Sequence, residues 1–395
     1  MGKTVIEKIV EHNTGRSVKP GDIVTVNVDR VMIHDIFIPF VAEKFKEMGF
    51  EKLWDPDKVV LIYDHLVPAS QLDDTRHFHV GDAFAAKYGM THVHRSDGIC
   101  HQLMTEAGYV KPGDVAFGTD SHTTTYGCVG AFSSGIGYTE MASILGTGTM
   151  WIRVPETIKV VINGKLPENV MSKDVILRLI GDLGADGATY KALEFSGSAV
   201  ESMTVASRMT ISNMAIEAGA KNGIFPVDEV TRAYLNGRSQ RTPVYYEADP
   251  DAEYEKTIEI DLDKLEPTVS YPHLPENTHP ASEGKDIRID QVVIGSCTNG
   301  RLEDMEAAYN ILKGRHIAKG VRGIIIPATM AVYKECILRG WTEAFIDAGC
   351  IVSTPTCGPC LGGYMGILAE GERCVSTTNR NFVGRMGHVK SEVYL

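Results

Sequence analysis

Short apolar runs and amphipathic segments alternate along most of the chain. Residues Val59–Tyr63 form a continuous apolar run, and similar runs occupy Val292–Ile294 and Gly323–Ile326. Runs of this kind are typical of strands buried on both faces of a parallel sheet. The segments Val5–His12 and Pro39–Met48 instead carry apolar residues at helical spacing. The pattern therefore predicts an α/β fold with largely parallel sheets.

Strict alternation of apolar and polar residues marks further candidate strands. Asp22–Val28 alternates in this way directly after the turn pair Pro20-Gly21 and is predicted to be a strand. The histidine pairs His77/His79 and His92/His94 are also spaced as on strands, and we interpret them as core or surface histidines without a catalytic role.

The composition changes after Val230. Residues 239–285 are rich in Pro, Glu and Asp and contain one clear predicted strand, Thr257–Leu262. We interpret this stretch as a domain edge followed by a long connector. The predicted division is therefore residues 1–285, connector included, and a final α/β unit at 286–395.

Composition and charge exclude several classes of protein. The 395 residues are 43% hydrophobic and 23% charged, which is ordinary for a globular protein and excludes a disordered one. The net charge of −12 argues against binding to nucleic acid or to an anionic membrane. The chain has no apolar run of the roughly 18 residues that a membrane span requires, and Met1–Lys8 has no apolar signal-peptide core. We therefore expect a cytoplasmic protein.

Two histidine–carboxylate combinations follow predicted strands. Asp64-His65 comes directly after the run Val59–Tyr63, and Asp120-Ser121-His122 lies in a segment rich in Thr, Ser and Gly. Active groups of α/β proteins lie beyond the carboxyl ends of strands. A carboxylate that pairs with one ring nitrogen orients an imidazole for acid–base catalysis. Both combinations are therefore candidate catalytic groups.

Three of the eight cysteines occupy turns rich in small residues. Cys297 lies in Gly295–Gly300, directly after a predicted strand, and Cys357 and Cys360 form a CxxC pair 60 residues later. Three such thiolates can bind zinc or three corners of an iron–sulfur cluster. Zinc lacks an obvious fourth ligand here, and a thioredoxin-like site would require the CxxC to open a helix near the start of a small domain. The pattern alone leaves these alternatives open.

The segment Asn379–Arg385 places Arg380 and Arg385 in one predicted loop. Arginine binds carboxylates through two parallel hydrogen bonds, so the pair fits a substrate that carries two acid groups.

Five separated motifs together resemble the aconitase superfamily, in order and in spacing. They are Asp64-His65, Gly118–Thr123, Gly295–Gly300, Cys357–Cys360 and Asn379–Arg385. The resemblance covers essentially the whole chain. The chain length resembles the large subunit of the two-chain members, which lack the swivelling domain of single-chain aconitases. The resemblance to this superfamily implies three α/β domains around a central cleft that holds an iron–sulfur cluster.

The resemblance also implies a role for individual residues. Cys297, Cys357 and Cys360 would bind a 4Fe–4S cluster, and Asp64 with His65 would protonate the departing hydroxyl group. The other expected acid–imidazole pairs are His101 with Asp120 and His122 with Glu194. The residues expected to contact the substrate or the cluster are His34, Asn379, Arg380 and Arg385.

The implied activity is that of a hydro-lyase acting on a hydroxy dicarboxylic acid. The first expectation is the isomerisation of 3-isopropylmalate and 2-isopropylmalate in leucine biosynthesis, and the alternatives are homoaconitate or 2,3-dimethylmalate chemistry. The superfamily's serine base lies in a Gly-Ser-Ser-Arg type motif of the swivel domain, so the resemblance implies a separate small subunit that carries it. A non-catalytic metal-binding or RNA-binding role, known in some aconitase relatives, is disfavoured by the net charge of −12 and the lack of a basic stripe.

Overall fold

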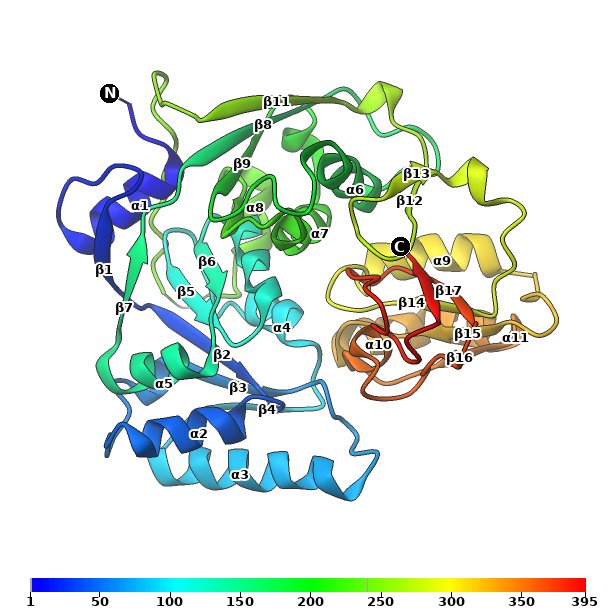
Figure 1. Cartoon of the computed structure of the whole chain (residues 1–395), viewed down its shortest axis with the longest axis horizontal. Helices are drawn as coiled ribbons and strands as arrows, with labels where there is room; N and C mark the ends of the chain where they lie inside the picture. The colour runs from blue at the N-terminus through cyan, green and yellow to red at the C-terminus, as the bar shows by residue number, and fades with distance from the viewer. Residues whose placement is uncertain (1, 240) are drawn as a thin grey trace.

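The computed structural model of the chain describes residues 2–239 and 241–395. It contains three parallel β-sheets with helices packed against them (Figure 1). Within these residues, no helix is both long enough and apolar enough to span a membrane. The predicted α/β fold with parallel sheets is thus confirmed.

The first sheet has five parallel strands in the order β4-β3-β2-β5-β6. Its strands are β2 (Arg30–His34), β3 (Val59–Tyr63), β4 (His92–Arg95), β5 (Val115–Gly118) and β6 (Phe132–Gly135). The helices of this region are α2 (Ile38–Glu47), α3 (Leu72–Tyr88), α4 (Cys100–Glu106) and α5 (Tyr138–Thr147). All residues of β2 and β3 are buried, as continuous apolar runs require. Because the strands are parallel, the residues that follow them meet at one edge.

The second sheet is built from β8 (Thr157–Asn163), β9 (Ala192–Ser196), β10 (Asn222–Ile224) and β11 (Lys256–Asp261), in the order β10-β9-β8-β11. Its helices are α6 (Ser172–Leu183), α7 (Val205–Met214) and α8 (Glu229–Leu235). Helix α7 packs against the 3₁₀ segment η2 (Ser121–Val129), which follows β5 of the first sheet. The second unit is therefore anchored beside the Asp120–His122 motif.

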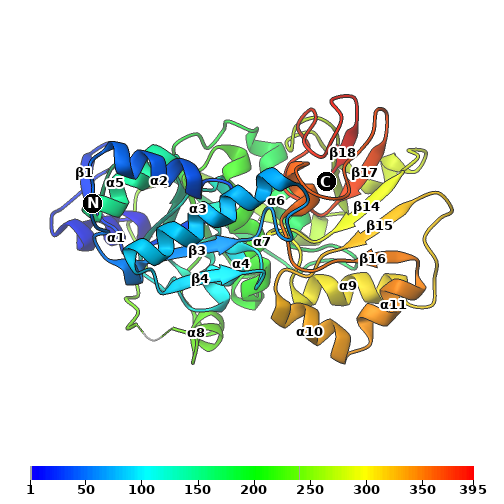
Figure 2. The ribbon, with the colours of Figure 1, turned by 90° about the horizontal axis from the view of Figure 1, so that it is seen from below.

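The third sheet has the order β16-β15-β14-β17-β18. Its strands are β14 (Gln291–Ile294), β15 (Arg322–Ile325), β16 (Cys350–Val352), β17 (Arg373–Ser376) and β18 (Glu392–Tyr394). Helices α9 (Leu302–Leu312), α10 (Met330–Leu338) and α11 (Trp341–Asp347) cover one face of this sheet (Figure 2). Separate apolar clusters lie on its two faces.

The remaining elements join these units. Helix α1 (Val5–Thr14) packs on the ribbon of β1 (Ile23–Asn27) and β7 (Thr149–Arg153), which are antiparallel. Strands β12 (Thr268–Ser270) and β13 (Thr278–Pro280) form a small antiparallel pair. The 3₁₀ segments besides η2 are η1 (Pro56–Lys58), η3 (Val200–Ser202), η4 (Ala215–Ala218), η5 (Leu262–Lys264), η6 (Ala281–Gly284) and η7 (Gly358–Leu361).

The predicted connector, residues 239–285, is partly built into the sheets; its residue 240 lies outside the described residues. Its predicted strand is confirmed as β11, which pairs with β8 over six residues. Backbone hydrogen bonds join Ser270 and Leu395 in both directions, so the connector also holds the end of the chain. The proposed division at residue 285 stays a prediction.

One secondary-structure prediction is wrong. His92 and His94 do lie on a strand, β4, but His77 and His79 lie in the middle of helix α3. Alternation over only three residues does not distinguish a strand from a helix. The buried residues Gly81, Phe84 and Ala85 of α3 follow the i, i+3, i+4 spacing of a helix face.

Candidate active site

Asp64 and His65 form a buried pair at the end of β3. His65 Nδ1 lies 2.7 Å from Asp64 Oδ1, and the other carboxylate oxygen of Asp64 accepts a hydrogen bond of 2.7 Å from the backbone N–H of Cys100. Burial by itself lowers the pKa of His65, but the charge and hydrogen bond of Asp64 outweigh burial and raise the pKa to about 10. The pair therefore holds a proton on the imidazole at neutral pH.

His34 ends the neighbouring strand, β2, and its ring stacks on that of His65 with centroids 4.2 Å apart. Burial, followed by the charge of His65, lowers the pKa of His34 to about 3. Neither ring nitrogen of His34 has a hydrogen-bond partner within the described residues. The two ring nitrogens of His34 are therefore buried polar atoms next to His65 whose hydrogen-bonding capacity is unused in the part of the chain that the structure describes.

Asp120, at the end of β5, is shared by two histidines. Its Oδ1 atom lies 2.9 Å from His101 Nε2 and 3.2 Å from His122 Nδ1. Burial by itself raises the pKa of Asp120, but the two histidine hydrogen bonds lower it well below its usual range. The predicted pairing of His101 with Asp120 agrees with this geometry.

The predicted pairing of His122 with Glu194 is wrong. His122 Nε2 lies 2.7 Å from Glu217 Oε1, whereas Glu194 accepts hydrogen bonds from the Val5 N–H and the Tyr254 hydroxyl group. Glu194 lies within β9 of the second sheet, while Glu217 lies in η4, which contacts the His122 segment. Only the packing of α7 and η4 on η2 brings the correct carboxylate to His122.

The three predicted cluster thiols come from two turns after strands of the third sheet. Cys297 follows β14, where Gly295 has a φ of +150° and a Cβ atom would lie 2.6 Å from the carbonyl oxygen of Ile326. Cys357 and Cys360 lie at the turn of η7 after β16. All three cysteines are buried and free of disulfides.

Asn379 connects the two thiol turns. Its Nδ2 atom lies 3.2 Å from Cys297 Sγ, and its Oδ1 atom lies 3.4 Å from Cys360 Sγ. The amide of Asn213, at the end of α7, also reaches Cys297 Sγ, at 3.3 Å. The thiols that are far apart in the sequence therefore converge, as the motif spacing predicts.

The thiol turns also touch the acid–base groups directly. The backbone N–H of Cys357 donates a hydrogen bond of 2.8 Å to the carbonyl oxygen of Asp64. The hydroxyl group of Thr356 donates to the same oxygen, at 2.9 Å. The edges of the first and third sheets thus form one site.

The charges of the thiols differ. The hydrogen bond from Cys357, followed by the charge of Arg385, outweighs burial and lowers the pKa of Cys360 well below its usual value. Burial raises the pKa of Cys297 to about 12. A thiolate is the form that binds a metal, so metal binding at this site would require deprotonation of the buried thiols.

This donor set fits an iron–sulfur cluster better than a single zinc ion. Four-coordinate zinc at a Zn–S distance of ~2.3 Å requires its sulfurs to lie about 3.8 Å apart. Among the described residues, the three sulfurs do not form a group with all members within 4.8 Å of one another. Soft donors on a wider spacing, with Asn379 between two of them, suit a larger inorganic group.

Arg380 and Arg385 lie beside this site in the loop after β17. Arg380 Nε donates to Glu217 at 2.8 Å, and one Arg385 amino group lies 3.8 Å from Cys360 Sγ. The Nε atom of Arg385 is buried and has no partner within the described residues. Both guanidinium groups therefore lie where they could bind an anionic ligand.

Residues 7–286 and 277–395 match the aconitase family (aconitate hydratase), so the match spans nearly the whole chain. The chain belongs to the aconitase family. Membership in the family implies an iron–sulfur cluster, for which the three converging thiols are the candidate ligands.

Curated relatives in the aconitase family match over the full length of the chain. The 3-isopropylmalate dehydratase large subunit of Caldanaerobacter subterraneus subsp. tengcongensis is 52% identical over 397 residues, covering 100% of this chain and 95% of the relative. The corresponding protein of Helicobacter hepaticus is 52% identical, and 3-isopropylmalate dehydratase large subunit 1 of Methanopyrus kandleri is 49% identical, both with the same coverage.

A solved structure supports the aconitase-family fold. The holo-form of aconitase X from Thermococcus kodakaraensis aligns with a TM-score of 0.53 over 95% of this chain and 89% of its own chain. The sequence identity in this alignment is 14%, so the likeness concerns the fold alone.

Three polar residues of the site were not predicted from the sequence: Asp35, Asn213 and Glu217. Asp35 accepts from the backbone N–H groups of His65 and Leu66 and so shapes the turn after β3. Asn213 lies near the end of α7 and Glu217 follows four residues later in η4, so the spacing places both on one face of a continuous helical segment. That spacing is the one local signal for them.

Proposed function

We propose that this chain is the large, cluster-binding subunit of a hydro-lyase that interconverts 3-isopropylmalate and 2-isopropylmalate in leucine biosynthesis. Full-length relatives at about 50% identity carry the name 3-isopropylmalate dehydratase large subunit, which supports the substrate. The observation that carries the chemistry is the contact between the Cys357 turn and Asp64, because it joins the thiols to a protonated imidazole.

In this proposal, Cys297, Cys357 and Cys360 bind three corners of a 4Fe–4S cluster. When bound, the cluster supplies a Lewis acid that polarises the substrate's hydroxyl group and a carboxylate. Asn379, which touches the sulfurs of Cys297 and Cys360, orients these ligands.

His65 would donate a proton to the departing hydroxyl group. A hydroxide ion is a poor leaving group, so protonation as the C–O bond breaks lowers the barrier. Asp64 occupies Nδ1, which leaves the proton on Nε2 for transfer. The raised pKa keeps this proton in place until the substrate binds.

Arg380 and Arg385 would bind the two carboxylates of the substrate. The His122–Glu217 pair orients Arg380, because Glu217 contacts both His122 Nε2 and Arg380 Nε. His34, neutral and unpaired, would contact the substrate from the β2 side. The base that removes the carbon-bound proton would be a serine on a small subunit that carries the swivel domain.

The test is to co-express the chain with a small subunit, reconstitute the cluster without oxygen and assay three candidate substrates in parallel. They are isopropylmalate, homocitrate or homoaconitate, and dimethylmalate. We expect a brown protein with broad absorption near 400 nm that acts best on isopropylmalate and has little activity without the small subunit. Full turnover by the chain alone would contradict the need for a small subunit. Preference for another substrate would contradict the assignment of isopropylmalate as the substrate.

A further inference from the structure

Arg301 lies directly behind the Cys297 turn. It caps the start of helix α9, and its side chain is 3% exposed. One guanidinium amino group donates 2.7 Å to the carbonyl oxygen of Cys297. The other donates to the carbonyl oxygen of Thr298 and, at 3.1 Å, to the hydroxyl group of Thr210. The Arg301 side chain therefore fixes the backbone of the Cys297 turn through hydrogen bonds to its carbonyl oxygens.

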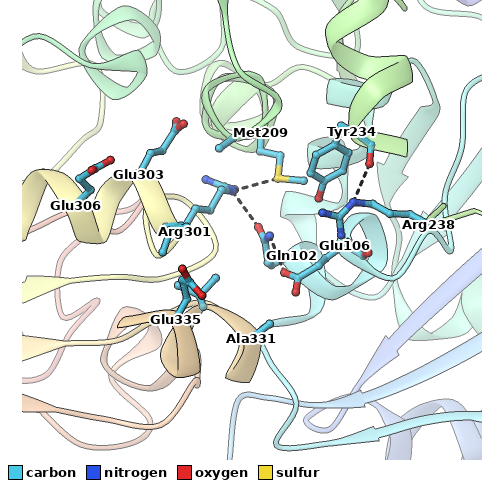
Figure 3. A pocket seen from close by; sticks show the side chains of 13 residues that line it. Gln102, Glu106, Met209, Tyr234, Arg238, Arg301, Glu303, Glu306, Ala331 and Glu335 are labelled. Carbon is cyan, nitrogen blue, oxygen red and sulfur yellow. Dashed lines mark hydrogen bonds between the residues drawn. The ribbon is translucent and has the colours of Figure 1, made fainter. Parts of the chain in front are cut away.

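The same guanidinium group connects all three units of the fold. Its Nε atom donates 3.0 Å to Gln102 on α4, beside the first sheet, and lies 3.1 Å from the sulfur of Met209 on α7, beside the second (Figure 3). Gln102 and Met209 come from two different chain segments, and both converge on Arg301. A shift of α4 or α7 would therefore be felt at the Cys297 turn.

Arg301 carries a buried charge that no carboxylate neutralises directly. Within the described residues its guanidinium forms no ion pair within 4 Å. The buried Asp304 carboxylate accepts a hydrogen bond from the Arg301 backbone N–H; burial raises the pKa of Asp304, and the charge of Arg301 opposes that rise. All the hydrogen-bond acceptors around the guanidinium are neutral. Burying an unpaired charge is costly unless hydrogen bonds and nearby negative charge offset the cost. These hydrogen bonds, together with the nearby Asp304 carboxylate, offset the cost of burying Arg301.

We infer that Arg301 is a positioning residue for the cluster: it holds the Cys297 turn in its ligating geometry. The inference rests on the proposed cluster. Arg301 would not touch the substrate or the inorganic group, because each of its three guanidinium nitrogens already donates to a group of the protein. Its effect would therefore appear in cluster retention before it appears in substrate affinity.

A matched control lies in the same place. Arg301 and Arg238 both line a cavity of about 490 Å³ that also includes Glu106 and Tyr234. Among the described residues, the Arg238 side chain donates hydrogen bonds to the backbone carbonyl groups of Tyr234 and Glu106 and to no residue of the thiol turns. Figure 3 shows Arg238 beside Tyr234 and Glu106. Removing the charge of Arg238 changes the cavity but leaves the hydrogen bonds from Arg301 to the Cys297 turn in place.

The experiment compares R301M, R301K and R238M in the full chain, purified with its small subunit and reconstituted without oxygen. The readouts are iron and sulfide per chain, the electron paramagnetic resonance spectrum of the oxidised cluster, and the rate of bleaching in air. Loss of a residue that orients a metal ligand costs about 10–100-fold in metal binding. We expect R301M to bleach about 10–100-fold faster with an altered spectrum, R301K to lie between R301M and the wild type, and R238M to match the wild type.

The inference would be overturned if R301M folds and bleaches at the wild-type rate with an unchanged spectrum. If R301M does not fold, Gln102→Leu decides, because it leaves Arg301 in place and removes the acceptor of Arg301 Nε, together with one hydrogen bond to Glu106 on the same helix, and should still speed bleaching. Unchanged bleaching in that variant would overturn the inference as well. A wild-type chain that assembles no iron–sulfur cluster would instead refute the proposed function, so the two failures are distinguishable.

Discussion

The edges of the first and third sheets meet in one site but are built differently. At the edge of the first sheet, imidazoles and carboxylates satisfy one another: His65 pairs with Asp64, and His101 and His122 share Asp120. At the edge of the third sheet, the partners of the thiols among the described residues are weak: the amides of Asn379 and Asn213, one arginine and, for Cys360, the Cys357 thiol. Apart from His34, the histidines of the acid–base half are paired with carboxylates, whereas the thiol half leaves its sulfurs available to a ligand.

This difference indicates which half depends on a cofactor. Buried polar pairs that satisfy each other hold their geometry without a ligand. Thiols with weak partners gain most from binding a metal group, because metal binding and local folding are coupled. Substitutions at the two edges should therefore fail in different ways, with loss of the cluster at the third sheet and loss of proton transfer at the first.

The largest effect is expected for Cys357→Ser. This variant should lose the cluster and all detectable activity, because a serine hydroxyl group does not replace a thiolate toward iron. Iron content, absorption near 400 nm and turnover measure the result. Cys350→Ser is the matched control, since Cys350 has the same 8% exposure in the same unit and should retain its cluster. Full activity of Cys357→Ser would refute the ligand assignment.

His65→Gln tests the other edge. We expect kcat to fall about 10²–10⁴-fold, the range of general acid catalysis, while iron content stays at the wild-type level. His94→Gln is the control, because His94 Nδ1 pairs with Asp97 at 2.8 Å on the neighbouring strand but lies outside the site. Loss of iron in His65→Gln would contradict the expectation that proton transfer at the first sheet and cluster binding at the third sheet are lost independently.

Arg380→Lys should lower kcat/KM while the acid–base groups of the first sheet and the thiols of the third sheet stay unchanged. A lysine keeps the charge but loses the two-pronged hydrogen bond to a carboxylate. The loss of one charge-assisted hydrogen bond, about 1.5–3 kcal/mol, corresponds to about 10–150-fold in kcat/KM. Arg373→Lys is the control, since Arg373 pairs with Glu392 and is 43% exposed. Unchanged steady-state kinetics in Arg380→Lys would contradict carboxylate binding.

The smallest effect concerns Glu217, which lies between the two edges. Burial by itself raises the pKa of Glu217, but His122 and Arg380 outweigh it and lower the pKa below the ordinary value of 4.5. A carboxylate with a lowered pKa stabilises the fold above its unfolded pKa, and this contribution is lost as the pH falls through the folded value. Glu217→Gln should therefore cost about 1.5–3 kcal/mol of unfolding free energy at pH 7, and the difference from the wild type should shrink below pH 4.5.

Denaturant unfolding across this pH range measures the effect of Glu217→Gln. Glu194→Gln separates the observed pairing from the predicted one, because Glu194 contacts Tyr254 and Val5 and not His122. It should leave turnover unchanged. An equal loss of turnover in both variants would contradict the pairing of His122 with Glu217.

Local pattern was enough to predict the buried strands, the α/β class and the motifs that carry the chemistry. The run Val59–Tyr63 is strand β3 residue for residue, because a short continuous apolar run is typical of a strand buried on both faces of a parallel sheet. Asp64 and Cys297 follow strands as expected, because parallel strands direct the residues after them to one edge.

Pairings between distant segments required the tertiary structure. Sequence spacing does not determine which of two glutamates reaches His122, and only the packing of η4 on η2 selects Glu217 over Glu194. The helical position of His77 and His79 depends in the same way on the core that α3 covers. The proposed role of Arg301 has no signal in the sequence beyond its place after the Cys297 turn. That role depends on its contacts with Gln102 and Met209, which belong to other units of the fold. Short-range periodicity encodes the elements, whereas long-range packing decides which side chains meet.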